Sequence, residues 1–188
     1  MHLRGAWQCL SVIRLSDCCS MLFKGSRITL RSVAISDVGT ILMWENDPDL
    51  EPFSDPHDPY TEEQIVDFVV SQQVGFEQNG QIRLMICVAG RAVGAVDIFD
   101  YDGASADVGV LVYSDDDRRR GYATEALEAV KALAPQLGIA TLWATIDSEN
   151  IASTALFRRC GFVKVDKNRY KYEQSCSSVN PFSRLWQP

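Results

Sequence analysis

The sequence lacks the features that define several large classes of protein. It has no apolar run near the ~20 residues that a membrane-spanning helix requires, and no internal repeat, low-complexity tract or break in composition. The cysteines show no zinc-site spacing; they are Cys9, Cys18, Cys19, Cys87, Cys160 and Cys176. These absences argue against a membrane-spanning protein, a repeat array and a zinc-binding domain.

The remaining composition is that of one globular domain. The chain has 188 residues, of which 46% are hydrophobic, enough for a single domain with a proper core. Cys87 lies in a predicted strand and Cys160 at a predicted helix end, so we expect buried free thiols there, and a reducing cytoplasm fits best. Residues 1–20 make a poor secretory signal. We expect them to be a disordered extension, or to precede a true start at Met21.

A basic, glycine-containing loop is the most informative segment of the chain. Arg118, Arg119, Arg120 and Gly121 follow an alternating apolar stretch over residues 107–113. Gly121 allows a tight turn and a close approach to a ligand. The loop then opens a predicted helix, whose first amides have no partner within the helix and whose dipole favours an anion. The order of strand, loop and helix therefore predicts a site for a pyrophosphate.

The helix after this loop has a clear amphipathic period. Its apolar positions recur at three- and four-residue spacing; they are Ala123, Leu127, Val130, Ala134 and Leu137. Gly138 is suited to end it. The loop lacks the Gly-Lys-Ser/Thr of a Walker site and has only one glycine of the dinucleotide fingerprint. On this segment alone, an ordinary strand–turn–helix with a solvated basic turn stays open.

A second motif follows a predicted strand over Thr141–Ile146 and the helix-capping residues 147–150. It comprises Asn150, Ser153, Leu156, Gly161 and Phe162. Together with the spaced Arg118, Gly121 and Ala123, it resembles the GNAT superfamily of acetyl-CoA-dependent N-acetyltransferases. A strand over 28–31, a helix over 36–48 and a hairpin over 84–97 look like the branch that acetylates ribosomal-protein N-termini and polyamines. The resemblance covers roughly residues 22–170.

The resemblance implies an α/β (α+β) fold and a reaction. The fold is a mixed, mostly antiparallel sheet, splayed at its middle, with helices on both faces. In the family, an amine attacks the thioester of acetyl-CoA directly, loop amides of residues 119–123 hold the pyrophosphate, and a strand amide within 108–112 stabilises the oxyanion. The cofactor contacts implied are Val110, Val112, Arg118, Arg119, Arg120, Gly121, Tyr122, Ala123, Thr124, Asn150 and Ser153. No metal is implied.

The catalytic residues match the family pattern less completely than the cofactor-binding residues do. Asp107 opens the splayed strand where relatives often carry Glu, and is the candidate general base, acting through water. The alternative is an exposed acid at a strand end with no catalytic role. The helix position at which relatives place a general-acid Tyr holds Phe157 here. Either the thiolate leaves unassisted or another group serves, with Tyr113 and Tyr122 nearby in sequence, although Tyr more often packs.

The acids of the chain, which give it a net charge of −7, are unevenly distributed. Residues 45–67 hold nine and no Lys or Arg: Glu45, Asp47, Asp49, Glu51, Asp55, Asp58, Glu62, Glu63 and Asp67. Thr61 with Gln64 forms a capping-box pattern that accounts for part of this charge. The resemblance implies that this segment forms a wall of the acceptor groove, so Asp47, Asp49 and Glu51 are predicted to attract a cationic acceptor. The alternative is a solvated loop.

These observations define one domain and two functional hypotheses. We expect the N-acetyltransferase domain over residues 21–175, followed by a tail over 176–188. The leading hypothesis is acetyl transfer to a small-molecule amine or a protein N-terminus by a monomer or homodimer, with no nucleic-acid or membrane partner. The alternative is a non-catalytic sensor that binds an acyl-CoA, with Phe157 marking lost catalysis.

Overall fold

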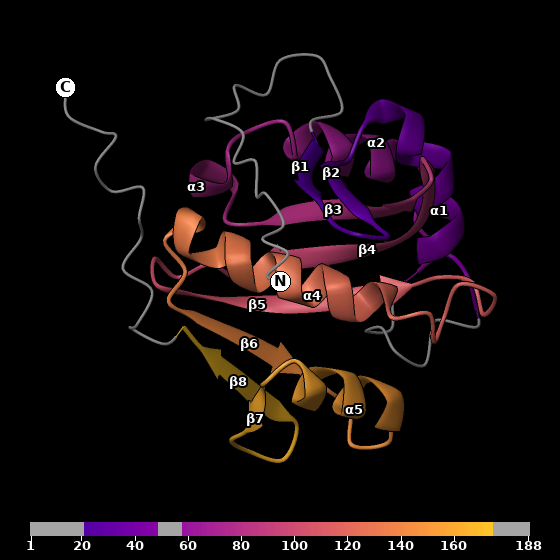
Figure 1. The fold of residues 1–188 in the computed structure, drawn as a ribbon. Helices are drawn as coiled ribbons and strands as arrows, with labels where there is room; N and C mark the ends of the chain where they lie inside the picture. Colours follow the sequence, from indigo (N-terminus) through magenta and orange to yellow (C-terminus); the bar gives the residue numbers. More distant parts are fainter. Residues whose placement is uncertain (1–20, 49–57, 175–188) are drawn as a thin grey trace, which may run out of the picture.

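A computed structural model describes residues 21–48 and 58–174 and places them in one sheet with helices on both faces (Figure 1). The strands are β1 (Met21–Lys24), β2 (Thr29–Ser32), β3 (Ile82–Val88), β4 (Arg91–Phe99), β5 (Ser105–Val112), β6 (Thr141–Thr145), β7 (Val163–Lys164) and β8 (Arg169–Glu173). Their order across the sheet is β1-β2-β3-β4-β5-β6-β8-β7. Neighbours pair antiparallel except β5 with β6, which are parallel. The predicted fold class is confirmed.

The sheet opens at its one parallel pair. β5 and β6 keep register over three residues on each side, ending at Asp107 opposite Trp143. Beyond that point β5 continues beside β4 as far as Val112, whereas β6 stays with β8. The two halves of the sheet therefore diverge from Asp107 onward. The edge of β5 over residues 108–112 has no register partner on β6.

Helices cover the two faces of the sheet and enclose two cores. The 3-10 helix η1 (Ile35–Asp37), α1 (Val38–Glu45) and α2 (Glu62–Ser71) cover one face of β3 and β4. On the other face, α4 (Tyr122–Leu133) and α5 (Ile151–Arg159) pack in the larger core, together with Phe76 of the short helix α3 (Phe76–Asn79). Alternation along the strands assigns the faces: Leu84 and Ile86 point to the larger core, Met85 to the smaller.

The helix boundaries follow local chemistry. α2 begins with the predicted capping box, in which the Gln64 amide donates to Thr61 Oγ1 at 3.3 Å and the Thr61 amide to Gln64 Oε1 at 2.8 Å. α4 passes into a 3-10 helix, η3 (Ala134–Leu137), at Pro135, because a proline has no amide to continue the helical ladder. Gly138 then ends it at φ +74°, as predicted.

Some expectations are refined and others lie outside the described residues. Residues 21–24, expected only to precede the first strand, form the edge strand β1 and pair with β2. Cys87 and Cys160 are buried free thiols, as predicted. The expectations for residues 1–20 and 176–188, and for Asp49 and Glu51, fall outside the described residues. No helix in the described ranges is long and apolar enough to cross a bilayer.

Candidate active site

The basic loop between β5 and α4 presents a set of helix-start amides. Gly121 is the N-cap of α4 and adopts φ +82°, a left-handed conformation that suits glycine. The first bond of the helix runs from the Glu125 amide to the Gly121 carbonyl, at 3.1 Å. The amides of Tyr122, Ala123 and Thr124 lie before this bond, so they have no acceptor within the helix. The local geometry is therefore that of an anion site.

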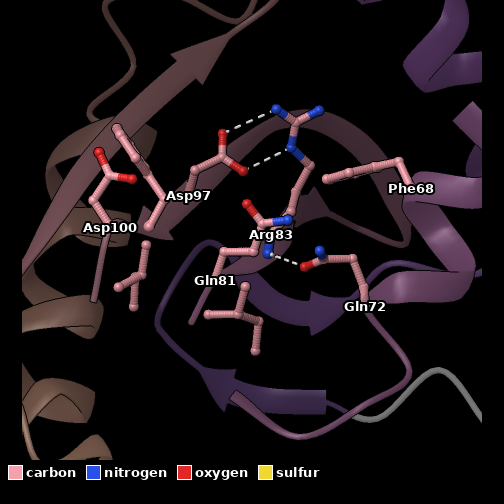
Figure 2. Close-up of a pocket in the computed structure, with 9 residues that line it drawn as sticks. Phe68, Gln72, Gln81, Arg83, Asp97 and Asp100 are labelled. Atoms are coloured by element: carbon pink, nitrogen blue, oxygen red, sulfur yellow. Dashed lines mark hydrogen bonds and ion pairs between the residues drawn. The ribbon is translucent and has the colours of Figure 1, made fainter. Parts of the chain in front are cut away.

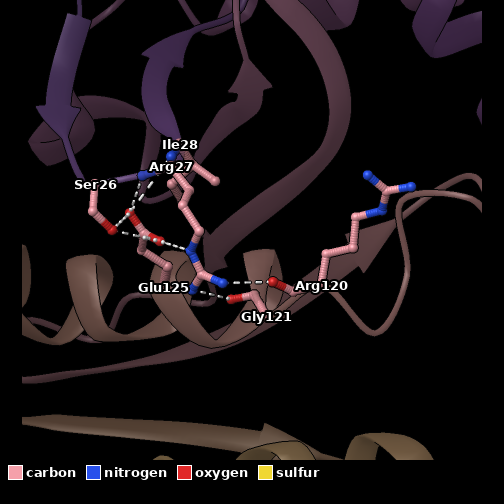
Figure 3. A network of polar contacts seen from close by, with 6 residues as sticks. All are labelled: Ser26, Arg27, Ile28, Arg120, Gly121 and Glu125. Carbon is pink, nitrogen blue, oxygen red and sulfur yellow. Dashed lines mark hydrogen bonds and ion pairs between the residues drawn. The ribbon is translucent and has the colours of Figure 1, made fainter.

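An arginine from a turn far away in the sequence donates hydrogen bonds to the backbone carbonyls of this loop (Figure 3). Arg27 lies between β1 and β2. Its Nη1 donates to the Arg120 carbonyl at 2.6 Å, and its Nη2 to the Gly121 carbonyl at 3.4 Å. Its Nε donates to Glu125 Oε2 at 2.9 Å, which ties the turn to the first turn of α4. We call Arg27 and Glu125 the loop clasp.

Glu125 is held in its charged form by the β1–β2 turn. Burial raises the pKa of the Glu125 carboxyl, but hydrogen bonds from the Arg27 amide, the Arg27 guanidinium and the Ile28 amide outweigh it, so the pKa is lowered. Gly25 permits this approach, because a Cβ there would lie 2.1 Å from Glu125 Oε1. The turn and the helix are thus in close contact.

A second arginine holds the other end of the loop. Arg91, which begins β4, makes a bidentate pair with Asp117 at 2.8 and 2.9 Å. The Asp117 side chain is only 6% exposed. The Arg91 hydrogen bond lowers the pKa of the Asp117 carboxyl, against an opposing contribution from burial. Arg27 of the β1–β2 turn and Arg91 at the start of β4 therefore each bond the loop.

The Asp117 pair should make part of the stability depend on pH. Because the pKa of Asp117 is lowered in the folded protein, its contribution is present above the ordinary carboxyl pKa of about 3.9 and is lost as pH falls through the folded value. We expect Asp117→Asn to lower the free energy of unfolding at pH 7, by an amount that shrinks toward pH 3. Urea unfolding of both proteins across this range measures the difference; a constant difference would contradict the assignment.

The predicted cofactor residues lie in the basic loop and the start of α4, on β5, and at the start of α5. Arg118, Arg119 and Arg120 are all exposed. Arg118 donates from Nε to the Val112 carbonyl at 2.9 Å and pairs with Asp115. Val110 and Val112 are half-buried against the larger core, and Tyr122 is buried in it. Asn150 caps α5 through a hydrogen bond that its Oδ1 accepts from the Ser153 amide at 2.9 Å.

Asp107 lies where the sheet opens, and it is paired. It is 8% exposed, so it is not the exposed strand-end acid of the alternative interpretation. Its Oδ2 accepts from Arg169 Nη2 at 2.8 Å, and its Oδ1 accepts from Nη1 of the same guanidinium. Arg169 crosses from β8 over the ring of Trp143 and also bonds Thr145. The carboxylate is therefore oriented at the divergence point by a distant strand.

Phe157, which replaces the general-acid Tyr of the family, and Tyr113, a candidate substitute donor, both make packing contacts. Phe157 is buried and meets Phe162 edge to face, with centroids 5.0 Å apart. Tyr113 Oη donates to Asp47 Oδ2 at 2.6 Å, and its ring stacks on Trp44 at 5.4 Å. Asp47, predicted to contact the acceptor, thus joins the end of α1 to the end of β5.

A cavity of about 250 Å³ opens between α2 and the ends of β3 and β4 (Figure 2). Arg83 crosses it, bonding Asp97 at 2.7 and 3.2 Å and also pairing with Glu45. Burial opposes the charge of Arg83, but Asp97 and Glu45 outweigh it and raise its pKa. Phe68 and Asp100 also line the cavity. The single guanidinium of Arg83 is therefore paired with two carboxylates, those of Asp97 and Glu45.

Strand register places this cavity beside Asp107. Asp97 is opposite Gly109 and Phe99 is opposite Asp107. Directly opposed residues of antiparallel strands share a face, so the cavity wall and Asp107 are on the same side of the sheet. Sequence reasoning missed Arg83 and Asp97, and it missed Arg27 and Arg91, which contact the basic loop. No cluster of metal ligands occurs among the residues that the structure describes.

Comparison with solved structures finds this fold in acetyltransferases. The ribosomal alpha-N-protein acetyltransferase RimL, solved with coenzyme A, superposes with a TM-score of 0.68 at 14% identity, covering 82% of this chain and 98% of that one. Spermidine N-acetyltransferase from Vibrio cholerae, solved with CoA and spermine, gives 0.66 at 17%, covering 80% and 97%. An acetyltransferase from Agrobacterium tumefaciens gives 0.65 at 21%, covering 87% and 100%.

A search of curated proteins finds no match to the sequence. The family model described as acetyltransferase (GNAT) domain matches residues 27–163. This span begins at the clasp arginine and includes the basic loop, the divergence of the sheet and the capped helix α5. The chain belongs to the GNAT acetyltransferase family.

Proposed function

We propose that the protein transfers an acetyl group from acetyl-CoA to a primary amine. The observation that carries the proposal is the combination of helix-start amides at Gly121 with a sheet that diverges beside them. The amides suit a pyrophosphate, and the open edge of β5 offers backbone groups to a pantetheine arm and a thioester. CoA and acetyl-CoA in structures of similar fold support this choice of co-substrate.

The residues near the divergence point fit direct transfer. The neutral amine attacks the thioester carbonyl carbon, an amide of β5 within residues 108–112 stabilises the oxyanion, and the carbon–sulfur bond breaks. Asp107 takes the amine proton through water. Since Phe157 has no proton to give, the thiolate leaves unassisted and is protonated by solvent.

We propose a cationic acceptor, such as a polyamine or a basic protein N-terminus. Asp97 and Asp100 line the cavity beside Asp107. Arg83, the opposing cation, pairs with Asp97 and also with Glu45. Asp47 lies just beyond the end of α1. It belongs to the acid-rich residues 45–67, which we call the acidic segment. A concentrated negative potential raises the local concentration of a cationic substrate. We propose that the protein acts in the cytoplasm, because free thiols such as Cys87 and Cys160 suit a reducing compartment.

Turnover separates this function from a non-catalytic acyl-CoA sensor. The test incubates the protein with acetyl-CoA and a panel of polyamines, basic peptides, amino acids and aminoglycosides, and follows release of free thiol. We expect amine-dependent thiol release. Tight CoA binding with no turnover on any amine would favour the sensor instead.

The acidic segment should make acceptor use sensitive to salt. Exposed charges act on encounter more than on contact energy, and at about 0.15 M ionic strength their field reaches only about 8 Å. We therefore expect the acceptor KM to rise with salt. Replacing Asp47, Asp49 and Glu51 together by neutral residues should raise that KM and flatten its salt response, leaving the KM of acetyl-CoA unchanged.

A charge-matched control identifies a local effect. Neutralising the exposed acids Asp147, Glu149 and Asp166, which lie outside the acidic segment, alters net charge equally and should leave the acceptor KM near the parent value. Equal effects of the two triple variants, or preference for a neutral amine, would make the acidic segment a solvated loop.

A further inference from the structure

The basic loop between β5 and α4 is contacted by a side chain from another part of the fold. Arg27 bonds two consecutive loop carbonyls, those of Arg120 and Gly121. A carbonyl and the amide that follows it belong to one rigid, trans peptide plane and point in opposite directions. By fixing these carbonyls, Arg27 fixes the direction of the Gly121 and Tyr122 amides.

Each of the three guanidinium nitrogens of Arg27 donates a hydrogen bond in this arrangement. Its Nε meets Glu125 while its two terminal nitrogens meet the carbonyls. Glu125 in turn accepts from the Arg27 amide at 3.1 Å and, weakly, from the Ile28 amide at 3.5 Å. The turn, the loop and the first helical turn are thereby joined in one polar network (Figure 3).

We propose that Arg27 and Glu125 are positioning residues for the cofactor: together they hold the loop amides in the direction that binds the pyrophosphate. The proposal rests on the proposed function, since it concerns the same loop. Glu125 carries negative charge beside an anion site, where a carboxylate would simply repel the ligand. Its presence is explained by the bonds that it makes to Arg27.

This role predicts an effect opposite to that of simple electrostatics. If charge alone mattered, Glu125→Gln would tighten coenzyme A binding, because it removes a negative charge near the phosphates. Under the clasp, Glu125→Gln releases Arg27 and weakens binding. The released loop must then be ordered when coenzyme A binds, and a cost equal to that of one charge-assisted hydrogen bond corresponds to about a tenfold rise in the Kd of coenzyme A. We expect that rise for Arg27→Gln and for Glu125→Gln.

The double variant tests whether the two residues act as one unit. Arg27→Gln with Glu125→Gln should bind coenzyme A about as weakly as either single variant, because the second change removes an interaction already lost. Arg159→Gln is the matched control: it removes one exposed arginine at the end of α5, and should leave Kd unchanged. Calorimetry measures all four affinities.

A ligand without the pyrophosphate distinguishes positioning from general damage. S-acetylpantetheine carries the thioester and the arm alone, so the clasp variants should use it with parental kcat/KM while acetyl-CoA shows a raised KM. Equal losses on both donors would overturn the proposal. Arg27→Lys keeps the charge but not the fork that reaches two carbonyls, and should resemble Arg27→Gln.

The remaining outcomes are also decisive. Unchanged or tighter binding by Glu125→Gln overturns the clasp while leaving coenzyme binding by the parent intact. Absence of coenzyme A binding by the parent protein would instead contradict the proposed function. If Arg27→Gln unfolds at a lower temperature, Glu125→Gln and Arg27→Lys provide the same comparison with smaller changes in the turn.

Discussion

Gly121→Glu is expected to lower affinity for coenzyme A by about a hundredfold or more. A non-glycine residue in a left-handed conformation costs about 1–2 kcal/mol. The loop relaxes away from this conformation to relieve the strain, and binding must restore it, with each 1.4 kcal/mol worth about a factor of ten in affinity. A Cβ at Gly121 would also lie 3.0 Å from Arg27 Nη1, so the clasp must shift. The added carboxylate then repels the phosphates. Calorimetry with coenzyme A measures the loss.

Gly103→Glu is the matched control for this substitution. Gly103 also has a left-handed φ of +97°, and nothing lies within 4 Å of a Cβ placed there. It occupies the turn before β5, at the opposite end of that strand from the loop. The control carries similar backbone strain and the same new charge, and should keep parental affinity. Unchanged affinity in Gly121→Glu would remove the basis for placing the pyrophosphate here.

Asp107→Asn is expected to lower kcat/KM by about 10²–10⁴, the usual contribution of a general base. Asparagine is nearly isosteric and can still accept one bond from Arg169, so the sheet should retain its geometry. Affinity for coenzyme A should be unaffected, because Asp107 is at the divergence point and not in the loop. Steady-state kinetics with the preferred amine, and calorimetry with coenzyme A, measure the two quantities.

Arg169→Gln separates the carboxylate from its ion pair. This variant breaks the bonds to both oxygens of Asp107 and leaves the carboxylate in place. If Asp107 accepts the proton, Arg169→Gln should retain more activity than Asp107→Asn. Equal losses would assign the pair a structural role, and a rate within about a factor of two of the parent for Asp107→Asn would exclude it as the base.

Local features of this fold were predictable because local sequence determines them. The period of Leu127 and Val130, the capping box at Thr61 and the left-handed Gly138 each depend on residues within a few positions of one another. The divergence of the sheet was implied by resemblance, and the register of β5 with β6 confirms it. Pattern and family motif together therefore predicted the strand β5, the basic loop and the helix α4 as elements of the fold.

The partners of the site residues could not be predicted in the same way. Arg27 and Glu125 are 98 positions apart, Asp107 and Arg169 are 62 apart, and Tyr113 and Asp47 are 66 apart. Each is one charged or polar residue among many, with no spacing that marks its partner. Glu125 lies off the apolar face of α4, and no local pattern marks it as the residue that the β1–β2 turn reaches.

The loop clasp has a consequence for folding. Contacts between residues far apart in sequence form only after the entropy of closing the intervening chain has been overcome. A folding intermediate that lacks the β1–β2 hairpin also lacks the guanidinium that orients the loop, even with β5 and α4 in place. On the proposed function, coenzyme binding selects the completed fold by mass action, with about 2.7 kcal/mol of stabilisation at a hundred times Kd. The hairpin of β1 and β2 is then among the segments that the coenzyme protects from opening.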